Sequence, residues 1–392
     1  MIQKNEISRN ILMSIFVLLS GAMIAVGRFY DQRLEIFGIN ITVVLSFLFV
    51  ITFISVFFLI KSINISLNKL LLYLFFSLLF ISNLTLWIFF DFTDYGIEKF
   101  INFILIPLPI ALVISEKFNI SDRNNMINVL LGISFFLFVV TLLNISTLSS
   151  SRSGVLGGGP IVLSRWLCFG AVITMFHPKI NRFKIFFVLL FLVSALFTGS
   201  RGPVLSFLVV MFLYAFFNFR KIFLKSIVAL SLLLFIGLIT GAFEHLSQYK
   251  TVSRIFMNIQ EGGLKKSTGR SLLFESSVKE ILDYPFGVGS GNFVEYTGNS
   301  QYFKNKNLYY PHNLFLEIAS EFGVITLFLF LLYLFLFIYL SFKINLTSKL
   351  ITGNMLFYTF AFLFLNSMIS GDLSDARLLF VFIPLMLVKD EK

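Results

Sequence analysis

Residues 324–342 read VITLFLFLLYLFLFIYLSF, a run without a single charged side chain. Lipid offers backbone groups no hydrogen-bond partners, so an apolar run of this length that crosses a bilayer must form a helix. Similar runs recur along the chain and predict about twelve transmembrane helices, at 11–27, 39–60, 69–90, 97–115, 127–147, 161–176, 183–199, 203–218, 222–243, 324–342, 352–370 and 376–388. The predicted fold is an all-α polytopic membrane protein.

The composition agrees with a chain whose solvent is mostly lipid. Hydrophobic residues make up 57% and charged residues only 13% of the 392 residues, whereas soluble domains contain about 25% charged residues. The net charge of +11 would suit nucleic acid, but the basic residues are spread between the apolar runs. We therefore exclude a nucleic-acid partner. The first run resembles a signal peptide, and we interpret it as an uncleaved helix because eleven further runs follow it.

Lysine and arginine residues set the orientation of the predicted helices. With both termini in the cytoplasm, sixteen of these residues fall inside, seven fall in short outer segments, and eight fall in a long outer segment. This orientation gives three regions. Residues 1–243 hold transmembrane helices 1–9, residues 244–323 form a large extracytoplasmic loop with short helices, and residues 324–392 hold transmembrane helices 10–12.

The one extended polar region is 244–311. Its helical periodicity predicts a helix over 270–282, which Pro285 ends. Every second residue of the stretch 287–291 is glycine, and this pattern predicts a flexible segment. Loops of this length usually have a function.

A second short helix is predicted where Pro311 precedes His312 and Asn313. Asn313, Glu317 and Glu321 recur every four residues and share one face beside an apolar face. We interpret this segment as an amphipathic helix lying at the outer membrane interface. His312 places a titratable imidazole at its start, while the two glutamates either orient a base or only solvate the helix.

Two arginines are candidates for anion binding. Arg201 lies in the turn Thr198-Gly199-Ser200-Arg201-Gly202-Pro203 between two apolar runs. A snorkelling arginine is the alternative, but snorkelling needs no flanking glycines. Arg270 lies at the start of the predicted loop helix, where the free N–H groups and the helix dipole favour an anion. Its alternative is a solvated surface arginine.

Further candidates lie in other outer segments. Arg165 falls within an apolar run, where an arginine is costly and marks function unless it snorkels. Arg152 lies in a glycine-rich loop that lacks the Gly-Lys-Ser/Thr of a P-loop. Asp372 and Arg377 share the last outer turn, where a plain ion pair is the favoured interpretation.

These candidates share one predicted location and one chemistry. Arginines and a histidine gather on the outer face, and the guanidinium group binds phosphate in a bidentate geometry. ATP and nucleotide sugars are on the other side, so the pattern favours a lipid-linked diphosphate. The chain has a single cysteine, Cys168, and no Cys or His pair at metal-ligand spacing. We expect no metal and no cofactor.

In order along the chain, these motifs resemble those of the O-antigen ligase and O-antigen polymerase superfamily of bacterial envelope glycosyltransferases. The resemblance covers roughly the second half of the chain. It lies in Ser200-Arg201-Gly202, in the loop from Gly269-Arg270 to the Gly-x-Gly segment 287–293, and in His312-Asn313-x-x-Leu316-Glu317-x-x-x-Glu321-x-Gly323. Arg152-x-Gly154 is similar to a further family pattern, although Ile161 follows Pro160 where the family often has Pro-Asn.

The resemblance implies a GT-C-like, inverting, metal-independent glycosyltransferase in the cytoplasmic (inner) membrane of a bacterium. Its donor would be an undecaprenyl-diphosphate-linked oligosaccharide, its acceptor a glycan or lipid-linked molecule, and a chain-length regulator a candidate partner. Arg201 and Arg270 would hold the diphosphate, and His312 would act as a base or orient the acceptor. The substrate-binding candidates are Arg165, Arg152, Asn313, Glu317 and Glu321.

The products implied are O-antigen, capsule or exopolysaccharide. We favour a polymerase over a ligase that joins the glycan to lipid A-core, although the motifs are shared. The alternative from another class is a polytopic secondary transporter, which predicts ionisable groups near the bilayer midplane. The predicted spans are nearly free of central charges, which favours the transferase. A non-catalytic assembly protein is a third alternative.

Overall fold

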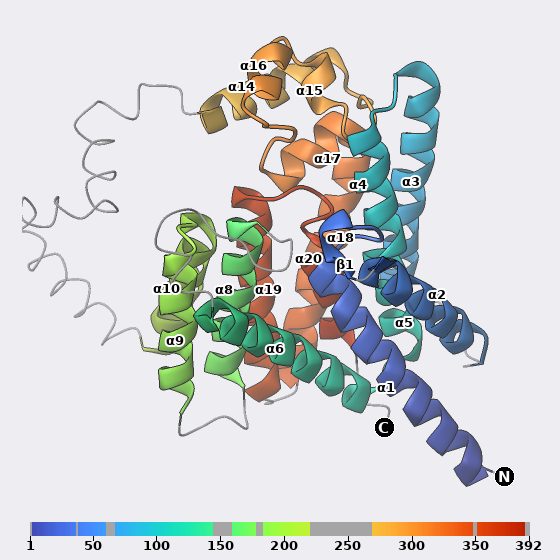
Figure 1. The fold of residues 1–392 in the computed structure, drawn as a ribbon, viewed down its shortest axis with the longest axis vertical. Coiled ribbons are helices and arrows are strands. Elements are labelled where there is room, and N and C mark those ends of the chain that lie inside the picture. Colours follow the sequence, from blue (N-terminus) through green and yellow to red (C-terminus); the bar gives the residue numbers. More distant parts are fainter. Residues whose placement is uncertain are drawn as a thin grey trace, which may run out of the picture.

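The computed structural model describes residues 2–36, 38–59, 67–143, 159–177, 183–219, 269–347 and 351–388. Long apolar helices form a bundle, and short helices cap one end of it (Figure 1). The bundle helices are α1 (Ile2–Val26), α2 (Ile41–Leu59), α3 (Leu67–Phe89), α4 (Asp94–Leu105), α5 (Pro107–Lys117), α6 (Ile120–Leu143), α8 (Pro160–Phe176), α9 (Lys184–Phe197), α10 (Arg201–Asn218), α18 (Val324–Thr347), α19 (Ile351–Ile369) and α20 (Arg377–Leu387). The short helices are α14 (Gly269–Asp283), α15 (Phe293–Tyr296), α16 (Ser300–Asn305) and α17 (Leu314–Phe322). After the 3-10 helix η1 (Gln32–Leu34), β1 (Glu35–Ile36) pairs antiparallel with β2 (Ile39–Asn40).

The predicted all-α membrane character is confirmed in the described residues. Six helical segments are long and apolar enough to cross a membrane. Five are single helices, namely Ser8–Val26, Ile41–Phe58, Lys69–Phe89, Ile120–Leu143 and Arg201–Asn218, and the sixth, Asp94–Lys117, consists of α4 followed by α5. Five shorter apolar helices coincide with further predicted spans, namely Pro160–Phe176, Lys184–Phe197, Val324–Leu340, Met355–Ile369 and Arg377–Leu387. The predicted span 222–243 lies outside the described residues, so the total of twelve stays a prediction.

One predicted span is interrupted. The run 97–115 was expected as a single helix, whereas α4 ends at Leu105 and α5 begins at Pro107. Proline lacks the N–H that a continuous helix would use and clashes with the preceding turn. The break leaves α4 and α5 as two consecutive helices that remain in contact.

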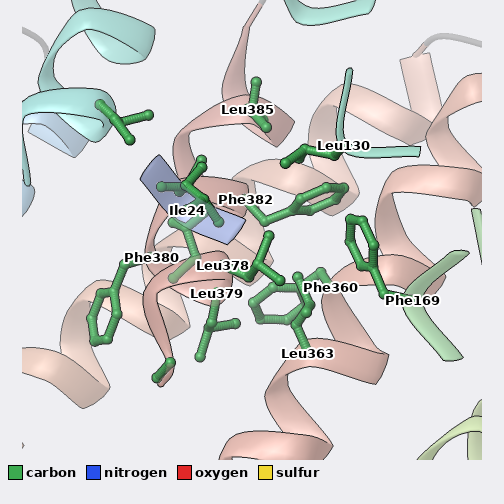
Figure 2. Close-up of a cluster of buried hydrophobic side chains, with 14 of the residues drawn as sticks. Ile24, Leu130, Phe169, Phe360, Leu363, Leu378, Leu379, Phe380, Phe382 and Leu385 are labelled. Carbon is green, nitrogen blue, oxygen red and sulfur yellow. The ribbon is translucent and has the colours of Figure 1, made fainter. Parts of the chain in front are cut away.

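The shortest predicted span, 376–388, proves to be the centre of the bundle. Residues 377–386 of α20 are all buried, and α20 contacts α5, α18 and α19. Figure 2 shows Leu378, Phe380 and Phe382 of α20 within a cluster to which α1, α6, α8 and α19 also contribute. An apolar helix that is buried on all sides belongs to the interior of a larger bundle.

Polar contacts divide the bundle into two ends. At one end, the Arg9 guanidinium pairs with Asp122 at 3.3 Å, and the Arg123 guanidinium donates to the Val388 carbonyl at 3.1 Å. The start of α1, the start of α6 and the end of α20 therefore meet there. The helices α14–α16 cap the opposite end of the bundle (Figure 1). This arrangement agrees with the predicted separation of the two membrane faces, while their orientation stays a prediction.

The glycine-rich segment 287–291 is not the flexible stretch that was predicted. Residues 287–294 are buried, and the segment runs along the last turn of α17. The backbone N–H groups of Val288 and Gly289 donate to the carbonyls of Ser320 and Glu321, at 3.1 and 2.8 Å. The alternating glycines arise because Gly287, Gly289 and Gly291 all have positive φ, a conformation that glycine adopts without strain.

Gly287 gives a direct test of this packing. A Cβ atom there would lie 2.6 Å from the Glu321 carbonyl oxygen, and the φ of 91° is unfavourable for any side chain. We expect Gly287→Ala to destabilise the protein by about 1–3 kcal/mol. Gly298→Ala is the matched control, because a Cβ atom at Gly298 meets nothing within 4 Å. Melting temperatures of the detergent-solubilised variants measure the difference, and equal values for the two variants would contradict the described packing.

Candidate functional site

His312 lies two residues before the first residue of α17 and has a backbone φ of 59°. Residues other than glycine seldom adopt this conformation, and those that do collect at functional sites. The next residue, Asn313, caps α17, because its Oδ1 atom accepts hydrogen bonds from the N–H groups of Phe315 and Leu316 at 3.0 and 3.1 Å. Its Nδ2 atom donates to the Met368 carbonyl at 3.2 Å, near the end of α19. Asn313 therefore fixes both the helix start and the position of His312 beside α19.

The helix α17 is buried within the protein, so its polar face is not solvated as an amphipathic surface helix would require, while its depth in the membrane stays a prediction. Its polar face meets Lys99 of α4, whose Nζ atom lies 2.8 and 2.6 Å from the two carboxylate oxygens of Glu321 and also pairs with Glu317. All three side chains are at most 1% exposed. The predicted polar face exists, but it points at a buried cation and not at water.

Burial raises the pKa of Glu317, and the neighbouring Glu321 carboxylate adds to the effect, while Lys99 opposes it. One ammonium group thus serves two carboxylates in a site without water contact. Removing a partner from such a cluster leaves a buried charge uncompensated, which is far more costly than losing an exposed pair.

The turn 370–377 is joined to the same cluster. The backbone N–H of Leu373 donates to Glu317 Oε1 at 2.8 Å, and the hydroxyl of Tyr95 donates to Asp372 Oδ2 at 2.8 Å. The predicted ion pair between Asp372 and Arg377 is wrong. Asp372 Oδ1 instead accepts the Asp375 N–H at 2.8 Å, which closes the turn.

Two buried arginines stabilise this turn. Arg165 of α8 is 5% exposed and donates to the Asp375 and Ser370 carbonyls at 2.7 and 3.1 Å. Arg377 donates from Nε to the Ile24 carbonyl at 2.6 Å and lies 3.5 Å from the Asp375 carboxylate. Arg165 was predicted as a snorkelling or substrate-binding residue, and the structure shows it occupied by backbone carbonyls.

Arg201 and Arg270 differ from these buried arginines, because both are exposed. Arg201 begins α10 after a tight turn in which Gly199 has a φ of 71°, as predicted. Arg270 lies in the first turn of α14, also as predicted. Within the part of the chain that the structure describes, neither guanidinium forms an ion pair or a hydrogen bond. Both are therefore available to an anionic ligand.

The Arg201 turn and the His312-Asn313 motif both contact the end of α19. A Cβ atom at Gly202, next to Arg201, would lie 3.4 Å from Ile369 Cγ2. Asn313 binds the carbonyl of the preceding residue, Met368. The Arg201 turn and the His312-Asn313 motif are thus adjacent to the same end of one helix.

His312 lies within the electrostatic influence of both signs of charge. Burial and, to a smaller extent, the Arg270 cation lower the pKa of His312 to about 4, against the opposing effect of Asp372. Its ring packs edge-on against Tyr310 with the centroids 4.3 Å apart, and its Nδ1 atom is buried without a partner in the described residues. The imidazole is therefore neutral near pH 7.

Arg152 lies outside the described residues. Within the described residues, no group of three or more His, Cys, Asp and Glu side chains is arranged to hold a metal ion. Sequence reasoning missed Lys99, although a lysine within a predicted apolar span is itself a signal that a carboxylate must lie nearby. It also missed Tyr310, for which no sequence signal exists.

Residues 185–331 match the family model described as O-antigen ligase. This match confirms the resemblance to the O-antigen ligase and polymerase superfamily. The matched segment runs from α9 into α18 and includes Arg201, Arg270 and His312. Together with the apolar helices it indicates a multi-pass membrane protein. No curated protein matches the chain.

Substitution of Lys99 tests whether the buried cluster with Glu317 and Glu321 stabilises the protein. We expect Lys99→Met to destabilise the protein by about 3–5 kcal/mol, because two carboxylates lose their buried partner. Lys304→Met is the control, since the Lys304–Glu295 pair is exposed and its loss should cost no more than about 1 kcal/mol. Thermal unfolding in detergent measures both. Adding Glu317→Gln and Glu321→Gln to Lys99→Met should restore part of the loss, and the absence of any difference between Lys99→Met and the control would refute the pairing.

The lowered pKa of His312 predicts unusual reactivity. In a protein with His177→Gln and His245→Gln, diethyl pyrocarbonate reports the neutral form of His312 alone, because the chain has three histidines. The rate should stay constant from about pH 8 to about pH 5, whereas an ordinary histidine loses reactivity below about pH 6.5. Arg270→Gln should move the fall to higher pH. A half-maximal rate near the ordinary value in the unsubstituted site would contradict the described environment.

Proposed function

We propose that this chain, whose segment 185–331 is of the O-antigen ligase type, is a membrane glycosyltransferase. It transfers an undecaprenyl-diphosphate-linked glycan to a sugar hydroxyl on the outer face of the cytoplasmic membrane. The observation that carries the proposal is that Arg201 and Arg270 are exposed and have no ion-pair partner among the described residues, and that they lie beside the His312-Asn313 motif.

Arg201 and Arg270 hold the diphosphate of the donor. A guanidinium group offers two parallel N–H donors to phosphate oxygens and stays charged at all relevant pH values. Negative charge grows on the departing diphosphate in the transition state, so fixed cations lower the barrier to bond breaking. An arginine already paired with a carboxylate would provide less of this stabilisation, and in the part of the chain that the structure describes neither of these two is so paired.

His312 takes the proton of the acceptor hydroxyl. The acceptor oxygen attacks the anomeric carbon from the face opposite the diphosphate, and the carbon–oxygen bond to the diphosphate breaks. Its electron pair leaves with the diphosphate, and the acceptor proton passes to the neutral imidazole. Attack from the opposite face inverts the anomeric configuration, and the step uses no metal.

The donor itself activates His312 in this mechanism. Without donor, burial and the nearby Arg270 cation keep the pKa of His312 at about 4, which makes the imidazole a weak base. A bound diphosphate offsets the charge of Arg270 and adds negative charge nearby, so the pKa of His312 rises toward a value near pH 7. The base becomes effective only when a donor is in place.

Most of the other candidate residues act by positioning Arg201, Arg270 and His312. Asn313 caps α17 and binds α19. Glu317 and Glu321 hold α17 against Lys99, and Arg165 holds the turn 370–377. Arg152, in the outer loop before α8, stays a substrate-binding candidate.

A polymerase is the form of the enzyme that we favour, with a second lipid-linked repeat unit as acceptor. The ligase form, with lipid A-core as acceptor, uses the same residues. A deletion strain separates them, because loss of a polymerase leaves single repeat units attached, whereas loss of a ligase leaves bare core. A secondary transporter is the competing class, and the buried Lys99 cluster is the feature that it would use, but the family match favours the transferase.

We expect Arg201→Ala, Arg270→Ala and His312→Ala each to lower the transfer rate by about 100-fold or more. Arg201→Lys should also fail, because an ammonium group cannot bind in a bidentate geometry. Surface polysaccharide on gels, from a deletion strain that expresses each variant, measures the outcome.

Arg9→Ala provides the matched control, because Arg9 pairs with Asp122 at the opposite end of the bundle. It should give normal product at equal membrane expression. Long-chain product from all three site variants would refute the assignment.

A further inference from the structure

A cavity of about 560 Å³ lies beside the site, between α1, α2, α6, α8 and the turn 370–377. Its volume is within the range of about 300–1,000 Å³ that is typical of small-molecule sites. One part is apolar and is lined by Ala25, Leu45 and Ile133, among others. The other part is polar and aromatic, with side chains from η1 and from the turn. The cavity is thus amphipathic, as is a sugar on a lipid anchor.

The charges in the polar part are balanced. Arg33 pairs with Asp31 at 2.7 Å, and Arg377 lies 3.5 Å from the Asp375 carboxylate. The third arginine, Arg28, pairs with Glu98 at 3.4 Å. These pairs contrast with Arg201 and Arg270 on the donor side, which have no ion-pair partner within the described ranges. A ligand with hydroxyl groups therefore suits this cavity better than a diphosphate does.

Apolar residues that are exposed on the surface of the bundle border the cavity on one side. Ile41 of α2 and Phe136 of α6 line it and are 38% and 56% exposed. Both belong to helices long and apolar enough to cross a membrane, so in a bilayer these side chains meet acyl chains. A ligand with a lipid anchor can enter from this side while its head stays in the polar part.

The cavity also connects to the proposed base. Tyr310 lines it, and the same ring packs against His312 with the centroids 4.3 Å apart. Asp372 lines the cavity and acts electrostatically on His312, as Arg270 does from outside the cavity. His312 is therefore flanked by the cavity and by Arg270, which has no ion-pair partner among the described residues.

We propose that this cavity binds the acceptor, a lipid-anchored glycan whose terminal sugar hydroxyl points past Tyr310 toward His312. The proposal rests on the proposed function. Aromatic rings of Tyr310 and Trp166 pack against sugar faces, and the carboxylates of Asp372 and Asp375 accept hydrogen bonds from hydroxyl groups. The anchor lies in the apolar part, between α2 and α6.

A two-substrate assay in proteoliposomes tests the cavity. The donor is the undecaprenyl-diphosphate-linked repeat unit, and the acceptor probe is the decyl glycoside of the same unit, which has no diphosphate and can only accept. Ala25→Trp fills the cavity from α1. We expect it to raise the KM for the decyl glycoside about tenfold or more, with the KM for the donor changed by less than about twofold.

Leu18→Trp is the matched control, because Leu18 lies on the same helix with 61% exposure. It should leave both KM values unchanged. Ile133→Trp fills the cavity from α6 and replaces Ala25→Trp if that variant fails to fold. An unchanged KM for the decyl glycoside in a folded cavity variant overturns the proposal.

A binding measurement separates this proposal from the proposed function. In Trp87→Phe, Trp166 is the remaining tryptophan, because the chain has two, and Trp166 lines the cavity. A bromodecyl glycoside of the repeat unit should quench its emission saturably, and bromodecanol should not. Ala25→Phe, which fills the cavity without adding a tryptophan, should abolish the saturable part. Absence of saturable quenching in Trp87→Phe refutes the cavity site. If quenching is saturable but the wild-type protein shows no transfer activity, only the transferase assignment is refuted.

Discussion

The ion cluster of Lys99 with Glu317 and Glu321 is the constraint on which the site depends. A charge removed from water is costly unless a partner compensates it. The two glutamates are one helical turn apart, so both reach one ammonium group only when α17 lies against α4 in one register. Since Glu317 also accepts the Leu373 N–H, the same cluster fixes the turn 370–377. His312 at the start of α17 and the cavity wall formed by the turn therefore share one support.

Backbone contacts of the segment 287–291 also hold α17 and α4 in place. The segment 287–291 binds the last carbonyls of α17, which would otherwise be unsatisfied inside the protein. Gly291 and Gly96 approach so closely that a Cβ atom at Gly291 would lie 2.4 Å from the Cα atom of Gly96. Because Gly96 is three residues before Lys99, this contact sets the position of the lysine on α4. The close contact between Gly291 and Gly96 therefore helps to place Lys99 where it pairs with Glu317 and Glu321.

Much of the fold could be predicted because lipid allows few structures. Apolar runs of sufficient length must be helices, and the described runs are. The placement of α17 could not be predicted, because periodicity shows that Glu317 and Glu321 share a face but not what the face meets. Water is the usual answer for two carboxylates, and here the answer is Lys99. The glycines of 287–291 suggested flexibility for a similar reason, since their positive φ values depend on contacts with a distant helix.

The candidate site shows the same division between local and distant information. Arg201, Arg270 and His312 belong to short contiguous motifs, so the sequence contains enough to select them. The cavity is lined by segments from Ala22 to Arg377, and no contiguous pattern marks it. Its aromatic and charged residues each have an ordinary explanation when considered alone, and only their common position beside Tyr310 and His312 gives them a joint meaning.

Charge pairing, under the proposed function, keeps diphosphate groups out of the cavity that binds the acceptor sugar. In the proposed reaction, negative charge grows on the donor diphosphate, while the acceptor contributes an uncharged hydroxyl. Unpaired cations are useful on the donor side alone. Unpaired arginines in the cavity would attract a donor diphosphate into a position where its anomeric carbon faces no acceptor. Neutralising Arg33 with Asp31 and Arg377 with Asp375 removes that attraction while keeping hydrogen-bonding groups for sugars, so discrimination comes from the absence of net charge.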